Sequence, residues 1–128
     1  SFIKFNDDEL FEINEKLGFI NNSVKENIKY ISKFTNTDQI CVTRGGDGAI
    51  LFYNQKFYEN NGYKVTVADT VGAGDSFLAT LIDCLLKTEN PQKAIDTACA
   101  IGALVAQNHG ANPKISLMQI KKIIANSL

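Results

Sequence analysis

Segments with the pattern of buried strands alternate along the chain with segments of helical periodicity, and this alternation leaves few folds open. Helices that separate strands favour a three-layer αβα sandwich whose sheet is mainly parallel. One tight connection, at residues 54–55, is short enough to join its neighbours as an antiparallel hairpin. The predicted strands are residues 2–5, 39–43, 49–53, 56–59 and 63–67.

Helix starts are marked by side chains that can cap an N-terminus ahead of an apolar repeat. Ser23 and Ser116 are followed three residues later by Glu26 and Gln119, which is the capping-box pattern. A further helix is expected directly after residues 72–75. The predicted N-cap residues are Asn6, Ser23, Asn90 and Ser116.

One helix differs from the others because it carries small residues around most of its circumference. It is predicted from residue 94 to about residue 108 and is rich in Ala and Gly. A helix of this composition is usually buried at close approach to its neighbours. We therefore expect it to pack inside the domain.

Composition places the chain among single-domain globular proteins. It has 128 residues, of which 45% are hydrophobic and 21% are charged, with no repeat or low-complexity tract. We interpret residues 1–128 as one domain. The formal net charge is -1 and no basic run is present, which argues against nucleic acid or an anionic membrane surface as the main partner.

The cysteines indicate a reducing compartment. Cys41, Cys84 and Cys99 are odd in number, widely spaced and set in apolar segments, so we expect buried free thiols. No apolar run approaches the roughly 20 residues that a membrane span requires, and no signal peptide is visible. The sequence predicts a cytoplasmic protein.

Residues 72–75, with the sequence G-A-G-D, combine small residues with an acid at the start of a helix. Backbone N–H groups in a first helical turn lack intrahelical acceptors, and the helix dipole adds to their attraction for a phosphate. Asp75 could accept a proton there from an attacking hydroxyl. The alternative is structural, because aspartate is favoured at helix N-termini for the dipole alone.

The longer run D-T-V-G-A-G-D at residues 69–75 resembles the D-T-x-G-A-G-D signature of the ribokinase/fructokinase-type (PfkB) carbohydrate kinases. The resemblance extends over nearly the whole chain and implies a ribokinase-like fold. It implies that Asp75 is the general base and that the amides of Gly72, Ala73 and Gly74 form an anion hole. One departure is Thr80, which is bulkier than the usual residue at that place in the helix.

Asn6 and Glu9 resemble the family's N-x-x-E motif, which implies a role in organising Mg²⁺ through water. The structural alternative is an ordinary capping pair, since Asn at an N-cap with Glu three residues later satisfies the helix end. Both interpretations can hold together.

Residues 43–48 resemble the family's T-x-G-x-x-G strand and turn, which lies along the nucleotide phosphates. The resemblance implies nucleotide contacts by Thr43, Gly45 and Gly48, against the alternative of a plain turn. Arg44, the single arginine, is expected either to pair with a phosphate or to lie in solvent.

The resemblance also implies sites near the end of the long helix and at the signature. Asn108 is expected near the adenine base, whereas His109 is interpreted as a favourable charge at a helix C-terminus. Backbone carbonyls of Asp69 and Val71 are expected to hold a monovalent cation such as K⁺.

The function implied is phosphorylation of a sugar hydroxyl by ATP with Mg²⁺, by an intact protein that is expected to be a homodimer. No segment corresponds to the family's sugar-binding half or lid, so the chain is interpreted as a C-terminal portion, inactive alone. The alternatives are a non-catalytic nucleotide-binding or regulatory module, and a kinase for a nucleoside or vitamin precursor.

Overall fold

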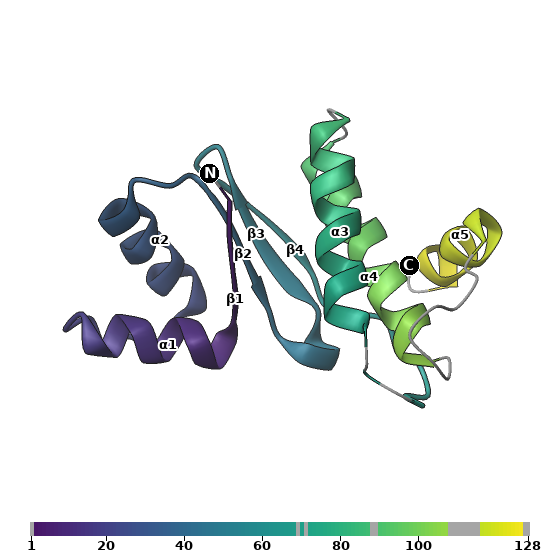
Figure 1. The fold of residues 1–128 in the computed structure, drawn as a ribbon, viewed down its shortest axis with the longest axis horizontal. Helices are drawn as coiled ribbons and strands as arrows, with labels where there is room; N and C mark the ends of the chain where they lie inside the picture. Colours follow the sequence, from purple (N-terminus) through teal and green to yellow (C-terminus); the bar gives the residue numbers. More distant parts are fainter. Residues whose placement is uncertain (1, 69, 71, 88–89, 108–115, 127–128) are drawn as a thin grey trace.

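The computed structural model describes residues 2–68, 70, 72–87, 90–107 and 116–126, and they form three layers (Figure 1). Helices α1 and α2 cover one face of a sheet, and α3 and α4 cover the other, with α5 packed against α4. The elements are, in order, β1 (Ile3–Asn6), α1 (Asp7–Lys16), α2 (Val24–Thr35), β2 (Gln39–Thr43), the 3₁₀ turn η1 (Gly45–Asp47), β3 (Ala49–Tyr53), β4 (Lys56–Asn60), α3 (Ala73–Leu86), α4 (Pro91–Gln107) and α5 (Leu117–Asn126). The αβα class predicted from the alternation is confirmed.

The sheet has the order β1-β2-β3-β4 and is less parallel than the sequence suggested. β1 and β2 are parallel because the helices α1 and α2 form the crossover between them, whereas β2–β3 and β3–β4 are antiparallel. Asn54 and Gln55 form the predicted two-residue hairpin turn, both at positive φ. The connection between β2 and β3 is also too short for a crossover. The expectation of a mainly parallel sheet is therefore wrong for the described strands.

Residues 63–67 are not a strand, in contrast to the prediction from their alternating pattern. β4 forms the edge of the sheet, and the chain that follows runs instead to α4, where the Ala68 amide donates to the Ala106 carbonyl at 2.8 Å. The apolar side chains at alternate positions, Tyr63, Val65 and Val67, line a cavity beside α4. The alternation of apolar and polar residues in this segment therefore places its apolar side chains in a cavity wall and not in a sheet.

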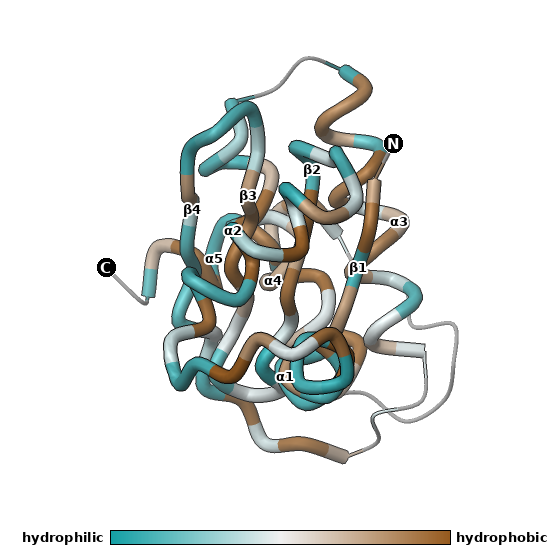
Figure 2. The backbone as a smooth tube through the Cα atoms, turned by 90° about the vertical axis from the view of Figure 1, so that its left-hand side faces the viewer, coloured by the Kyte–Doolittle hydropathy of each residue, from teal (hydrophilic) through white to brown (hydrophobic). Residues whose placement is uncertain are grey.

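Two apolar cores lie on the two faces of the sheet. On β3, Leu51 belongs to the core under α3 and α4, whereas Ile50 and Phe52 belong to the core under α1 and α2. Hydropathy follows this arrangement in Figure 2, where β1 is largely in hydrophobic colours and much of α1 in hydrophilic ones. Within the ranges that the structure describes, no helix has the length and apolar character that a membrane crossing requires.

The helix starts follow the predicted caps with one exception. Asn6 and Ser116 each form a reciprocal capping box, and Asn90 accepts from the Gln92 amide at 2.8 Å. Ser23 caps α2 through the Glu26 amide, but its own amide donates to the Asn21 side chain at 2.7 Å. The predicted box at Ser23 is thus only half formed, because Asn21 takes the place of Glu26.

Candidate active site

The carboxyl ends of the parallel strands β1 and β2 bring two predicted motifs together. Asn6 and Thr43 are register partners at these ends, and the Thr43 hydroxyl donates to the Phe5 carbonyl at 3.4 Å. The N-x-x-E residues therefore lie beside the glycine turn that follows β2. In open α/β sheets this edge is where ligands bind.

The Asn6 and Glu9 side chains are both occupied in capping α1. Asn6 Oδ1 accepts from the Glu9 amide at 2.7 Å, and Glu9 Oε1 accepts from the Asn6 amide at 2.8 Å. The capping interpretation is confirmed. Both residues are exposed, and a carboxylate has lone pairs beyond the one used in the box, so the pair also fits water-mediated contact with a cation.

The turn at residues 44–48 is closed by backbone geometry. The Arg44 amide donates to the Gly48 carbonyl at 2.8 Å, and Gly45 and Gly48 both have positive φ. A Cβ at Gly48 would collide with the Asn60 carbonyl and the Gly62 amide, so only glycine fits. The turn is consequently pressed against the loop that follows β4.

Arg44 does not lie in solvent, which was one of the two expectations for it. Its side chain is only 20% exposed, and its guanidinium donates to the Asn60 carbonyl at 3.1 Å. The Glu59 carboxylate lies 3.9 Å from Nη1. The arginine therefore joins the turn to the end of β4 in this structure and does not lie in solvent.

α3 begins at the glycine-rich junction. Gly72 is the N-cap in the left-handed conformation, with a φ of 82°, and contributes no side chain to the cap. The Ala73 amide donates to the Thr70 carbonyl at 3.2 Å, and the Ser76 amide donates to the Gly72 carbonyl at 2.9 Å. Of the predicted anion-hole amides, that of Ala73 is thus bonded within the loop in this structure.

Asp75 lies in the first turn of α3 and is exposed. Thr80, one turn further along, donates its hydroxyl to the Ser76 carbonyl at 2.7 Å. The bulkier residue therefore satisfies its polar group on its own helix, and it leaves the first turn of α3 in regular geometry.

A cavity of about 320 Å³ joins the glycine turn to the start of α3. Thr43, Gly45 and Gly48 line it from the turn, and Ala73 and Gly74 line it from the helix. The other residues of its wall are mostly small or apolar: Lys4, Gly46, Gly62, Tyr63, Val65, Val67, Thr70, Phe77, Cys99, Gly102, Ala103 and Ala106. A concave apolar site with a few polar groups is typical of a pocket for a small ligand.

Some predicted site residues are not in this wall. Gly72, Asp75, Asn6 and Glu9 lie outside the lining. Three further predictions, on Asp69, Val71 and Asn108, fall outside the residues that the structure describes. Among the residues described, no cluster of three or more His, Cys, Asp or Glu side chains could hold a metal ion directly.

Sequence reasoning missed Lys4 and Tyr63, which both line the cavity. Lys4 is the only charged residue of β1 and lies between the apolar residues Ile3 and Phe5. A lysine flanked by apolar residues in a strand is the sequence signal that could have identified it. Tyr63 belongs to a predicted strand, and the residues around it in the sequence do not indicate a cavity. Its pKa is raised by burial, so the hydroxyl remains neutral near pH 7.

α4 packs closely against its neighbours, as its small residues predicted, and it also forms one wall of the cavity. A Cβ at Gly102 would contact the Ala73 carbonyl at 3.5 Å and Phe77 Cβ at 3.6 Å, so α4 and α3 approach closely there. Burial raises the pKa of Cys99 to about 12, with a smaller contribution from Asp96 in the same direction. The thiol is therefore protonated at physiological pH, and all three cysteines are buried and outside any disulfide, as predicted.

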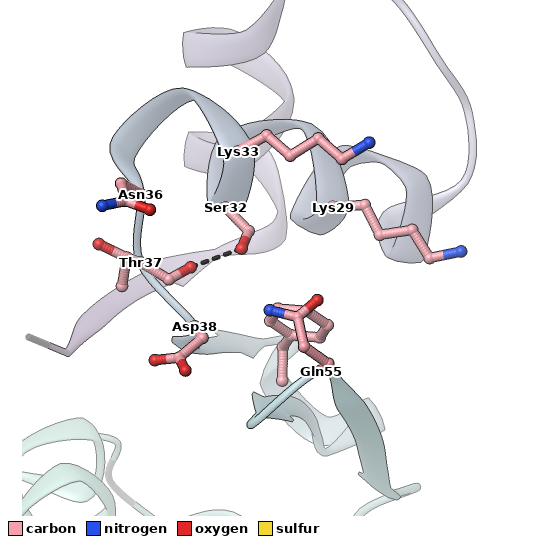
Figure 3. A pocket seen from close by; sticks show the side chains of 8 residues that line it. Lys29, Ser32, Lys33, Asn36, Thr37, Asp38 and Gln55 are labelled. Atoms are coloured by element: carbon pink, nitrogen blue, oxygen red, sulfur yellow. Dashed lines mark hydrogen bonds between the residues drawn. The ribbon is translucent and has the colours of Figure 1, made fainter.

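A second cavity, of about 410 Å³, lies at the opposite end of the sheet, and none of the predicted site residues that the structure describes lines it (Figure 3). It is formed by the end of α2, the start of β2 and the β3–β4 turn. In the close-up, the chains of Lys29 and Lys33 extend away from Asp38 and Gln55, and Ser32 donates to the Thr37 carbonyl. The geometry of the predicted motifs thus points to the first cavity.

Comparisons with known proteins identify the family of the chain. Residues 1–117 match the model described as pfkB family carbohydrate kinase. The chain belongs to the pfkB family of carbohydrate kinases.

Individual relatives show how much of such a protein the chain represents. It is 32% identical to a ribokinase from Dictyostelium discoideum over 82% of this chain and 32% of that protein. It is 35% identical to a tagatose-6-phosphate kinase from Staphylococcus epidermidis over 81% of this chain and 34% of that protein. The chain therefore spans about a third of the length of the curated relatives it matches.

The fold comparison gives the same result. A ribokinase structure from Thermotoga maritima superposes with a TM-score of 0.80 and 20% identity, over 98% of this chain and 42% of that one. At this identity the likeness concerns the fold, and it confirms the ribokinase-like architecture.

Proposed function

We propose that the protein containing this chain transfers the terminal phosphoryl group of ATP to a hydroxyl of a sugar or sugar phosphate. The observation that supports this most is one cavity lined by both the glycine turn after β2 and the first residues of α3. Family membership supports the carbohydrate class of acceptor. The named relatives are a ribokinase and a tagatose-6-phosphate kinase, which makes both free and phosphorylated sugars candidates.

The adenine and ribose would occupy the apolar cavity between the loop at residues 62–67 and α4. The phosphates would then extend along the glycine turn towards the N-terminus of α3, where amides and the helix dipole attract negative charge. Lys4 supplies a cation in the wall of the cavity. Mg²⁺ would be organised through water by Asn6 and Glu9, and it would neutralise charge that develops on the transferred phosphoryl group.

Asp75 is proposed as the general base. Its carboxylate would take the proton of the acceptor hydroxyl as that oxygen bonds to the γ-phosphorus and the bond to the ADP oxygen breaks. Exposure in the first turn of α3 leaves this carboxylate accessible to a substrate. The 128 residues by themselves are proposed to be inactive, because transfer needs both substrates held in line.

The proposal is tested by ATP consumption of the full-length protein across sugars, sugar phosphates and nucleosides, with Mg²⁺ and K⁺ present. Asp75→Asn should lower kcat by about 10²–10⁴-fold with little change in ATP affinity, the usual effect of a lost general base. Asp83→Asn is the matched control, since Asp83 is an exposed aspartate on the same helix. Near-normal turnover of the Asp75 variant would reject the base, and ATP binding without turnover of any acceptor would favour a regulatory module.

A further inference from the structure

Asn60, at the end of β4, bonds to three separate parts of the chain. Its Nδ2 donates to Asp96 Oδ1 at 2.9 Å and to the Tyr63 hydroxyl at 3.0 Å, and its Oδ1 accepts from the Gly62 amide at 2.8 Å. Its backbone carbonyl accepts from the Arg44 guanidinium at 3.1 Å. This one half-buried residue thus connects the glycine turn through its backbone, and the loop after β4 and α4 through its side chain.

These three segments are also three walls of the cavity. The turn contributes Gly45 and Gly48, the loop contributes Tyr63, and α4 contributes Cys99 and Gly102. Asn60 is not itself part of the wall. A displacement at Asn60 would therefore move opposite sides of the cavity relative to each other.

The turn and the loop touch through their backbones. A Cβ at Gly48 would collide with the Asn60 carbonyl, and a Cβ at Gly62 would collide with the Gly46 carbonyl. The position of the turn thus depends directly on the backbone at residues 60–62. The Asn60 side chain holds this backbone through the Gly62 amide.

The hydrogen bond from Asn60 to Asp96 of α4 requires one particular orientation of the Asn60 side-chain amide. Asp96 Oδ1 also accepts from Gln92 Nε2 at 2.9 Å, and the same Nε2 donates to the Glu59 carbonyl at 2.8 Å. The carboxylate requires a donor from Asn60, and the Gly62 amide requires an acceptor, so only one orientation of the Asn60 amide satisfies both. Asp96 precedes the cavity residue Cys99 by less than one helical turn.

We propose that Asn60 and Asp96 are a positioning pair that sets the width of the nucleotide cavity by holding the glycine turn and the Tyr63 loop against α4. The inference rests on the proposed function, because it takes the occupant to be ATP. The pair acts through Tyr63 and Gly48 and touches no reacting atom. Its loss should therefore affect ATP affinity more than the chemical step.

Asn60→Asp tests the pair in the full-length protein, since it keeps the shape and replaces a donor by a carboxylate facing Asp96. We expect the dissociation constant for ATP, measured by titration calorimetry, to rise about tenfold, with KM for ATP following it and kcat within about twofold. Asn61→Asp is the matched control, because it adds the same charge at the exposed neighbouring position and should leave both constants unchanged.

Asn60→Asp combined with Asp96→Asn should restore most of the ATP affinity, because the carboxylate at position 60 then faces an amide donor at position 96. A lower kcat at unchanged KM, or no recovery in the double variant, would overturn the proposal. If Asn60→Asp does not fold, Tyr63→Phe should still raise KM about threefold, because it removes the hydroxyl that accepts from Asn60 Nδ2 at 3.0 Å and donates to the Asp96 carbonyl at 3.4 Å; an unchanged KM would overturn the proposal. Absence of ATP binding by the unmodified protein would instead reject the proposed function.

Discussion

Gly45 and Gly48 lie in the same turn and both have positive φ, but they differ in the space available for a side chain. Gly45 has open space around its Cα and a φ of 59°, a conformation that other residues adopt at modest cost. Gly48, with φ 86° and ψ -141°, is in a region nearly restricted to glycine and has backbone atoms where a Cβ would lie. The requirement for glycine is thus much stronger at Gly48.

Gly48→Ala should lower the free energy of unfolding by roughly 2–5 kcal/mol, the sum of backbone strain and overpacking. Gly45→Ala should lower it by only about 1 kcal/mol. Urea denaturation of both variants measures the difference. Equal losses would show that the contact between the turn and the loop after β4 is not as tight as described.

The N-terminus of α1 has an observed capping role and a proposed role in organising Mg²⁺, which one substitution cannot separate. Asn6→Ala removes the bond to the Glu9 amide and should cost about 1 kcal/mol of stability. Asn6→Ser keeps a capping oxygen but shortens the side chain, so it should cost only a few tenths of a kcal/mol. Thermal unfolding gives these values.

Activity then distinguishes capping from magnesium organisation. If Asn6 also acts on Mg²⁺, the stable serine variant should require a higher Mg²⁺ concentration for half-maximal turnover. An unchanged Mg²⁺ requirement in Asn6→Ser would leave capping as the function of this residue.

The two faces of the sheet contribute to two different cores, and only one of these cores adjoins the cavity. Leu51 and Ile50 are adjacent in β3 and almost completely buried, but they point into opposite cores. The core of Leu51 includes Phe77 and Cys99, which also line the cavity. Among the residues that the structure describes, the core of Ile50 shares none with the cavity wall.

Leu51→Ala and Ile50→Ala should each reduce stability by about 2–5 kcal/mol. Only Leu51→Ala should also weaken ATP binding, because the space it leaves allows Phe77 and Cys99 to shift. Calorimetric titration with ATP at a temperature where both variants remain folded tests this. Equal affinities would contradict a coupling between this core and the cavity.

The features of this fold that depend on interactions between residues close in sequence could be predicted from the sequence. The capping boxes at Asn6 and Ser116, the hairpin turn at Asn54 and the strand Gln39–Thr43 all agree with the sequence-based expectation. Their conformations depend on φ/ψ preferences and on hydrogen bonds across three or four residues. The glycine motifs belong to the same group, and the cavity does bring the turn and the start of α3 together.

Contacts between residues far apart in sequence were determined only by the tertiary structure. Asn60 and Asp96 are 36 positions apart, Arg44 is bonded to the end of β4, and Lys4 and Tyr63 line the same cavity. The extended pattern at residues 63–67 does not pair with the edge strand β4, and its apolar side chains line the cavity instead. None of these outcomes follows from local pattern, because each depends on which surfaces the two cores bring together when they are buried.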